Sequence, residues 1–177
     1  MIQLSKVADL SDTERTAVRA LSQAVYPPDE VKDWPGRHVE WAKPDSCVRI
    51  HGADGELTCF VGLIVREGTL DGRAVTIGGI GGVMTHPLHR NQGLAGKGIR
   101  RAIAAFRDKG NITFGLLACD ARLLEYYSKL GWREFTGKTM VRQRSEQVAF
   151  TFNRVMTIGV LEATPHSGMI DLCGPPW

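Results

Sequence analysis

The chain has 177 residues, of which 43% are hydrophobic and 23% are charged, and its formal net charge is +3. This length fits one domain with a sizeable core, so we expect a single domain over residues 1–177. The small net charge and the lack of a Lys/Arg-rich tract argue against sequence-independent nucleic-acid binding, which needs clustered cations.

Four cysteines are scattered along the chain and form no C-x-x-C pair. A zinc site would need Cys or His ligands in close pairs, so we expect no metal. The stretch MIQLSKVADLSD has neither the basic start nor the apolar core of a signal peptide. No apolar run approaches the roughly 18 residues that span a bilayer. We therefore expect a cytoplasmic protein without membrane contact.

The first predicted helix begins after Ser11, which forms a capping box with Glu14. Apolar residues then recur at helical spacing until Pro27-Pro28 end the helix. The irregular stretch PPDEVKDWPGRHVEWAKPD that follows is acidic and carries two tryptophans. It is either a loop that wraps the core or part of a substrate site.

Three extended segments come next, separated by Asp54-Gly55 and Asp71-Gly72, which are hairpin turn signals. The mixed order of elements predicts an α+β or α/β fold, with helices packed on a single sheet. The extended segments are 47–52, 56–68 and 73–85. They are followed by a helix over 93–107, a strand over 111–119, a helix over 121–131, strands over 132–137, 139–144 and 148–158, and a tail over 164–177 without clear periodicity.

The stretch AVTIGGIGGVMTHPLHRNQGLAGKGIRRAI, residues 74–103, carries the first functional signal. Gly78, Gly79, Gly81 and Gly82 remove four side chains from a predicted strand, and interior glycine weakens a strand unless something approaches its backbone closely. The strand then runs through a glycine-containing loop into a helix. Such a loop often cradles phosphate, because helix N-terminal amides carry partial positive charge.

Two nucleotide-binding patterns fail on this stretch. The P-loop G-x-x-x-x-G-K-[ST] would need Gly at Asn91 and a hydroxyl at Gly98. The dinucleotide pattern G-x-G-x-x-G would need a third glycine at Met84. A nucleotide-binding protein is therefore not expected, and the plain alternative is a glycine-bent strand followed by a capped helix.

A third pattern, R-x-x-G-x-A, resembles the signature of the Gcn5-related N-acetyltransferase (GNAT) superfamily, which transfers an acetyl group from acetyl-CoA to an amine. The resemblance implies a mixed, mostly antiparallel sheet with helices on both faces. It implies that glycines in the strand leave room for the cofactor and the amine, with Gly81 and Gly82 bordering the amine. The expected pyrophosphate loop is Arg90, Asn91, Gln92, Gly93, Leu94, Ala95 and Gly96, and the expected pantetheine-binding residues are Val83, Met84 and Thr85.

A second motif, LLEYYSKLGWREF, resembles the C-terminal signature of the same superfamily. It places Tyr127 at the position of the general acid. When an amine attacks the thioester, CoA leaves as a thiolate, and a phenol with pKa near 10 can protonate it. The alternative for Tyr127 is a core aromatic, and we expect Tyr126 to serve packing. The resemblance covers about residues 57–136.

The acceptor is less constrained by sequence. The acidic loop with Asp29, Glu30 and Asp33 resembles the aminoglycoside 2′-N-acetyltransferase branch, and so does the tail IDLCGPPW with Asp171 and the Trp177 carboxylate. The resemblance implies that these groups face a polycationic sugar, whose ammonium groups carboxylates can pair. A solvated loop and a tail docked for stability fit equally well.

One departure concerns the base. The aminoglycoside enzymes carry a glutamate nine positions before the motif arginine, and here that position is Gly81. A base must remove the amine proton before attack, and the candidates are His86, Asp120 and the acidic loop. We favour Asp120 with a water chain, because it follows a strand and precedes the helix of Tyr127.

The sequence thus predicts an acetyl-CoA-dependent N-acetyltransferase in which the bound amine attacks the thioester directly. A covalent route through Cys119 and a catalytically silent acetyl-CoA-binding module stay open. The acceptor could be an aminoglycoside, a polyamine, an amino acid or a peptide amine. A homodimer is also open, because strand edges near the C-terminus could pair.

Overall fold

The computed structural model describes the backbone of residues 1–177 and every side chain except those of Glu30 and Val31. The helices are α1 Asp12–Val25, α2 Pro28–Val31, α3 Leu94–Lys109 and α4 Leu124–Ser128, with 3₁₀-helices at Val7–Asp9, Pro35–His38, Pro87–His89 and Ala121–Leu123. The strands are β1 Ile2–Lys6, β2 Ser46–His51, β3 Leu57–Leu70, β4 Arg73–Thr85, β5 Phe114–Cys119, β6 Arg133–Glu134, β7 Lys138–Gln143, β8 Glu146–Ala149, β9 Arg154–Gly159 and β10 Met169–Asp171.

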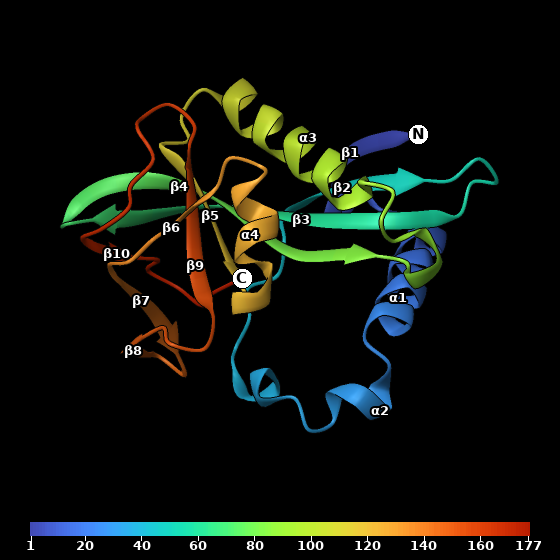
Figure 1. Ribbon diagram of the computed structural model, residues 1–177, viewed down its shortest axis with the longest axis horizontal. Helices are drawn as coiled ribbons and strands as arrows, with labels where there is room; N and C mark the ends of the chain where they lie inside the picture. Colours follow the sequence, from blue (N-terminus) through green and yellow to red (C-terminus); the bar gives the residue numbers. More distant parts are fainter.

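The strands form one sheet in the order β6-β9-β5-β4-β3-β10-β7-β8 (Figure 1). In addition, β2 pairs with β3, and β1 pairs with β2. The pairs β4–β5 and β10–β7 are parallel, and the remaining pairs are antiparallel. This confirms the predicted mixed, mostly antiparallel sheet. The long strand β3 is shared by two neighbours on one edge, because β2 pairs with its first half and β10 with its last two residues.

Helices cover both faces of the sheet, as predicted. Successive strand residues point to opposite faces, and Val61 joins the core cluster beneath α3 whereas Phe60 joins the cluster beneath α1. On the α3 side the helix contributes Ile99 and Phe106, and on the α1 side it contributes Leu21. Figure 1 shows these two helices on opposite sides of the sheet.

The predicted capping box of α1 is present, since Ser11 and Glu14 satisfy each other's backbone amides. Sequence did not reveal a second role of Glu14. Its Oε1 accepts a hydrogen bond of 2.5 Å from Arg49 of β2, and Arg49 is only 3% exposed. This pair attaches the start of α1 to the sheet.

The prediction of one strand over residues 148–158 was wrong. The chain leaves β8 after pairing with β7 and must cross to pair β9 with β5, so Phe150 and Phe152 lie in a link between the two strands. The tail, for which no periodicity was visible, forms β10 and a segment that packs on the α1 face. We call residues 169–177 the strap.

The strap is held by contacts with strands far away in sequence. Trp177 is 5% exposed, and its indole Nε1 donates a 3.0 Å hydrogen bond to the carbonyl of Leu116. The Arg66 guanidinium lies 5.1 Å from the centroid of the Trp177 ring and donates a 2.6 Å hydrogen bond to the Pro175 carbonyl. The strap is therefore part of the core.

The strap corrects the expected purpose of three glycines in β4. A Cβ on Gly79 would lie 2.3 Å from the Trp177 ring, and a Cβ on Gly81 would lie 3.1 Å from the Trp177 backbone. On the opposite face, a Cβ on Gly78 would lie 2.7 Å from the Phe106 ring of α3. These glycines make room for the protein's own aromatic residues. Gly82 differs, because it has a φ of 57° and no close neighbour.

Candidate active site

The strands β4 and β5 separate at the centre of the sheet. Their parallel pairing runs from Ile77 opposite Phe114 to Ile80 opposite Leu117 and goes no further in the described chain, although both strands continue. On the other edge of β4, the register with β3 shifts between Phe60 and Gly62, where Gly82 forms part of a bulge. A bulge bends a strand, so the end of β4 presents an unpaired backbone edge toward β5.

The three residues expected to bind pantetheine lie on this free edge. Their side chains serve packing: Met84 is 6% exposed in the α1-side core, and Val83 packs against the α3-side core. The Thr85 hydroxyl donates to the Cys59 sulfur at 3.6 Å. Only the backbone N–H and C=O groups of these residues are suited to an added, strand-like ligand.

The loop before α3 fits a diphosphate. Gly93, at the N-cap, adopts the left-handed conformation with a φ of 71°, and Asn91 has a φ of 63°. The helix bonding begins with Lys97, whose amide donates to the Gly93 carbonyl at 3.0 Å, so the amides of Leu94, Ala95 and Gly96 precede the first helical bond. These amides, the positive end of the helix dipole and the exposed Arg90 form an anion site. Gln92 is exposed in the same turn.

Tyr127 lies in the core beside the ends of these strands. It is 6% exposed and packs edge-on against Trp132, with ring centroids 6.5 Å apart. Burial raises the pKa of Tyr127 far above its ordinary value, and the neighbouring Cys119, Tyr126 and Tyr26 raise it further. The phenol therefore keeps its proton at neutral pH, so it can donate that proton but cannot act as a base. Tyr26, at the end of α1, is a site neighbour that the sequence pattern did not single out.

Tyr126 does more than the packing expected of it. It is 38% exposed, and its hydroxyl lies 3.7 Å from the position of a Cβ on Gly96. The Arg100 guanidinium lies 3.5 Å from the same position. Tyr126 therefore lies between the start of α3, where the expected pyrophosphate loop ends, and its neighbour Tyr127.

Asp120 follows β5 and lines a cavity of about 260 Å³ together with Ala121, Thr151, Phe152, Asn153 and Arg154. Its carboxylate accepts hydrogen bonds from the backbone and the guanidinium of Arg122, at 2.9 and 3.0 Å. These bonds lower the pKa of Asp120 to about 2. Such a carboxylate stays ionised at neutral pH and is a weak base, so the structure does not support proton removal by Asp120.

Two other candidate groups are also constrained. Burial raises the pKa of Cys119 to about 11, with Asp120 and Glu134 adding to the effect. A thiol in this state is a poor nucleophile. His86 caps the 3₁₀-helix before the pyrophosphate loop, where its Nδ1 accepts a hydrogen bond from the Leu88 amide at 3.3 Å.

The expected acceptor residues are not all brought together. Asp29 and Asp33 are exposed on the segment after α1, and the side chain of Glu30 lies outside the described part. Asp171 is placed elsewhere, because it pairs with Thr69 of β3 whereas Gly81 pairs with Gly62. At about 3.4 Å per residue, this separation is roughly 24 Å. Asp171 instead accepts hydrogen bonds from Gln147 and the Cys173 amide, so its position does not support the expected role in the site.

The separated strands, the free amides at the start of α3 and the buried phenol are the features that a transferase for a diphosphate-carrying donor would use. The sequence profile described as an acetyltransferase (GNAT) domain matches residues 6–135. The chain belongs to this family of N-acetyltransferases, as its two motifs predicted. The match gives no support to the aminoglycoside 2′-N-acetyltransferase branch.

Solved structures with the same fold include a GNAT family N-acetyltransferase, YhbS, from Escherichia coli in complex with CoA. It shares 14% identity over 98% of this chain and 89% of its own, with a TM-score of 0.64. An acyl-CoA N-acyltransferase from Pseudomonas aeruginosa shares 20% identity over 89% of this chain and 97% of its own (TM-score 0.61). A GNAT family acetyltransferase from Brucella melitensis, in complex with acetyl-CoA, shares 15% identity over 96% of this chain and 94% of its own (TM-score 0.59). No protein among the curated ones matches the chain.

No described helix has the length and apolar character that crossing a membrane would require. Within the described side chains, no group of three His, Cys, Asp or Glu residues is arranged to hold a metal ion.

Proposed function

We propose that the protein transfers an acetyl group from acetyl-CoA to the primary amine of a small molecule by direct attack on the thioester. The observation that carries this proposal is the order of three features: the free end of β4 leads through the Arg90–Gly96 loop into α3, and α4, which bears Tyr127, approaches the start of α3 at Tyr126. The anion site at the start of α3, the free edge of β4 and the Tyr127 phenol follow one another as the diphosphate, pantetheine arm and thioester of the donor would. The complexes of the Escherichia coli and Brucella relatives with CoA and acetyl-CoA support the same donor.

The protein groups that would hold the donor are mostly backbone. The amides of Gly93 to Gly96 and the Arg90 side chain would bind the diphosphate, and the backbone of Val83 to Thr85 would pair with the pantetheine amides. This use of backbone explains why a glycine with a positive φ stands at the helix start. A side chain at Gly93 would be strained in this conformation.

Bound acetyl-CoA supplies an activated carbonyl on a sulfur leaving group. As the amine nitrogen bonds to that carbon and the carbon–sulfur bond breaks, Tyr127 donates its proton to the departing sulfur. The ammonium of the acceptor loses one proton to water before it attacks. The second proton, which the nitrogen loses as the amide forms, passes through water and restores the Tyr127 phenol. We assign Asp120 a fixed negative charge at the edge of the acceptor site rather than proton removal, because its pKa of about 2 keeps it ionised and Arg122 shares that charge.

Asp29 and Asp33 favour a cationic acceptor in general, because both are exposed on the segment after α1. An aminoglycoside is the polycationic form of this proposal. The choice between it and a simpler amine depends on the charges and the size of the cavity at Asp120.

The test replaces Tyr127 by Phe and follows release of the CoA thiol from acetyl-CoA with a panel of amines. We expect kcat to fall roughly 100-fold or more, which is the lower range for general acid catalysis. The rise in melting temperature caused by acetyl-CoA should be retained. Tyr126→Phe removes the neighbouring hydroxyl and is the matched comparison, with a much smaller expected loss. An undiminished kcat in Tyr127→Phe would refute the assigned role, and a protein that acetyl-CoA does not stabilise would refute the donor.

A further inference from the structure

An aromatic cluster joins two segments that are far apart in sequence, and it reaches the cavity at Asp120 through Phe152. Trp34 and Trp41 come from the segment after α2, and Phe150 and Phe152 come from the link between β8 and β9. Trp34 stacks on Trp41 with centroids 6.1 Å apart, and its edge contact with Phe152 has a centroid distance of 5.7 Å. Phe152 also lines the cavity, so the cluster is continuous with the cavity wall.

The Trp34 ring is fixed although it is exposed. The Trp41 indole donates a 2.8 Å hydrogen bond to the Gly36 carbonyl. Gly36 itself is buried against Trp34, whose ring atoms lie 2.2 Å from the position of a Cβ on Gly36. Trp34 nevertheless keeps 43% of its surface exposed. The exposed part of this ring can contact another flat group.

The same segment is tied to the β7–β8 turn by polar contacts. The Glu40 amide donates to the Gln143 side-chain oxygen at 2.8 Å, and Gln143 Nε2 donates to the Glu40 carbonyl at 3.0 Å. The segment that carries Trp34 and Trp41 is thus attached to the rest of the protein at Glu40 as well as through its aromatic contacts.

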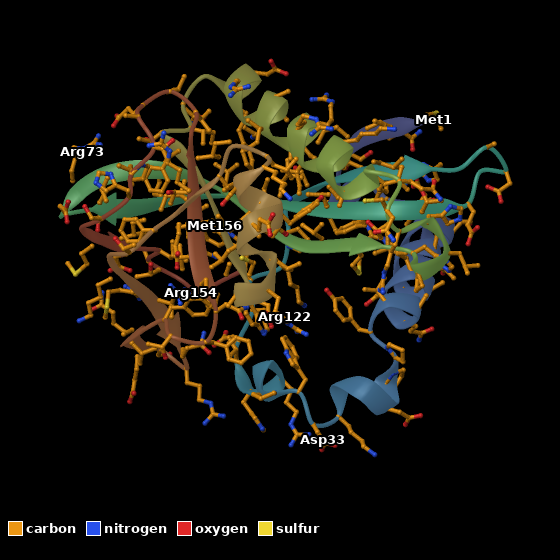
Figure 2. The ribbon with its side chains drawn as sticks, viewed as in Figure 1. Met1, Asp33, Arg73, Arg122, Arg154 and Met156 are labelled. Atoms are coloured by element: carbon orange, nitrogen blue, oxygen red, sulfur yellow. The ribbon has the colours of Figure 1, made fainter. Side chains whose placement is uncertain are left out.

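The charges around the cavity are already compensated. Asp120 is paired with Arg122, and Arg154 forms an ion pair with Glu134. Figure 2 shows Arg122 at the lower end of α4, and Asp33 at the outer turn of the segment below it. A polycation would need several free carboxylates at once, and the cavity wall supplies one that already has a guanidinium partner.

The small size of the cavity also argues against a large polycationic acceptor. Pockets for drug-sized ligands span roughly 300–1,000 Å³, and this one has about 260 Å³. It begins at Asp120, the residue after Cys119, and Cys119 is a close neighbour of Tyr127. A ligand here can therefore place an amine at the end of β5 and a small apolar group against Phe152.

We propose that the acceptor is a small monoamine bearing an aromatic ring, with the ring held against Trp34 and Phe152. This inference rests on the proposed acetyl transfer and names the acceptor class of the same site. The ring contact supplies affinity and orientation, and the neutralised ion pairs around the cavity select against acceptors with several charges.

The test measures kcat/KM for CoA thiol release with four amines: 2-phenylethylamine, 2-cyclohexylethylamine, spermidine and kanamycin. The first two have similar size and charge, so their ratio reports on the ring. We expect 2-phenylethylamine to be preferred about tenfold over the cyclohexyl compound, and both polycations to be poorer acceptors. In Trp34→Leu, KM for 2-phenylethylamine should rise about tenfold with little change in kcat. The same rise should be absent in Leu161→Ala, an exposed apolar residue after β9.

The outcomes separate this inference from the function on which it rests. Thiol release with a preferred polycation, equal use of the two monoamines, or an unaffected KM in Trp34→Leu would overturn the aromatic acceptor while leaving acetyl transfer in place. No release with 2-phenylethylamine would also overturn it. Only the loss of stabilisation by acetyl-CoA would remove the donor site as well.

Discussion

The contact between Gly79 and Trp177 can be tested by a double-mutant cycle. Gly79→Ala places a methyl group 2.3 Å from the fused edge of the indole, and this rigid ring has no flexible end that could move aside. Overpacking of a core typically costs about 1–3 kcal/mol. Trp177→Ala removes the ring and should cost about 3–5 kcal/mol, part of which is the lost hydrogen bond to Leu116.

The free-energy costs of these two substitutions should not be additive. Once the indole is gone, the methyl group of Gly79→Ala enters the space that the ring leaves, so its cost should fall by about 1–3 kcal/mol in the Trp177→Ala background. Gly78→Ala is the matched control. Its methyl group would meet Phe106 on the opposite face, so its cost should be the same whether Trp177 is present or not.

The assay is urea unfolding of the wild type, the three single variants and the two double variants, with the free energy of unfolding taken from the midpoint and slope. Costs of Gly79→Ala that agree within about 0.5 kcal/mol in both backgrounds would refute the packing argument. If Trp177→Ala also lowered the free-energy cost of Gly78→Ala, the assignment of the two glycines to opposite faces would be refuted.

Two further predictions concern titration and chemistry. Hydrogen bonds from Ser11 and Arg49 lower the pKa of Glu14 from 4.5 to about 2. The ionised carboxylate therefore stabilises the fold above its unfolded pKa, and this stabilisation is lost as the pH falls from about 4.5 to about 2. The stability advantage of the wild type over Glu14→Gln should shrink in this window, and urea midpoints near neutral pH and near pH 3 would show it. An advantage that stays constant would contradict the pairing. For Cys119, whose pKa is raised to about 11, incubation with acetyl-CoA alone should leave the intact protein mass unchanged. An acetylated Cys119 in a peptide digest would instead support a covalent route.

Local signals predicted the parts of the site that depend on the backbone. The run Arg90 to Gly96 is a helix start in which glycine permits a positive φ, and this requirement is readable in one short segment. The same holds for Tyr127, because the following Gly131 and Trp132 end a short helix at a fixed distance from it. The class of fold followed from the order of such segments.

What sequence could not supply was contact between distant segments. The glycines of β4 indicated a close approach, and the expected occupant was a ligand, whereas the structure places Trp177 and Phe106 there. No periodicity in the tail could have shown this. Asp120 was favoured as a base from its position in the chain, but its pairing with Arg122 depends on the local turn and changes its chemistry.

The strap also has a consequence for the order of folding. The hydrogen bond between Arg66 and Pro175 joins positions 109 residues apart, and contacts of this range form late because closing a long loop costs chain entropy. The cluster beneath α3 draws chiefly on residues 48–132, with a smaller contribution from β9. We therefore expect a partly folded form in which the cluster beneath α3 is assembled and the strap is not yet packed against the sheet. In that form Gly79 and Gly81 would leave a hollow beneath β4, so the face of the sheet that Trp177 covers would be completed last.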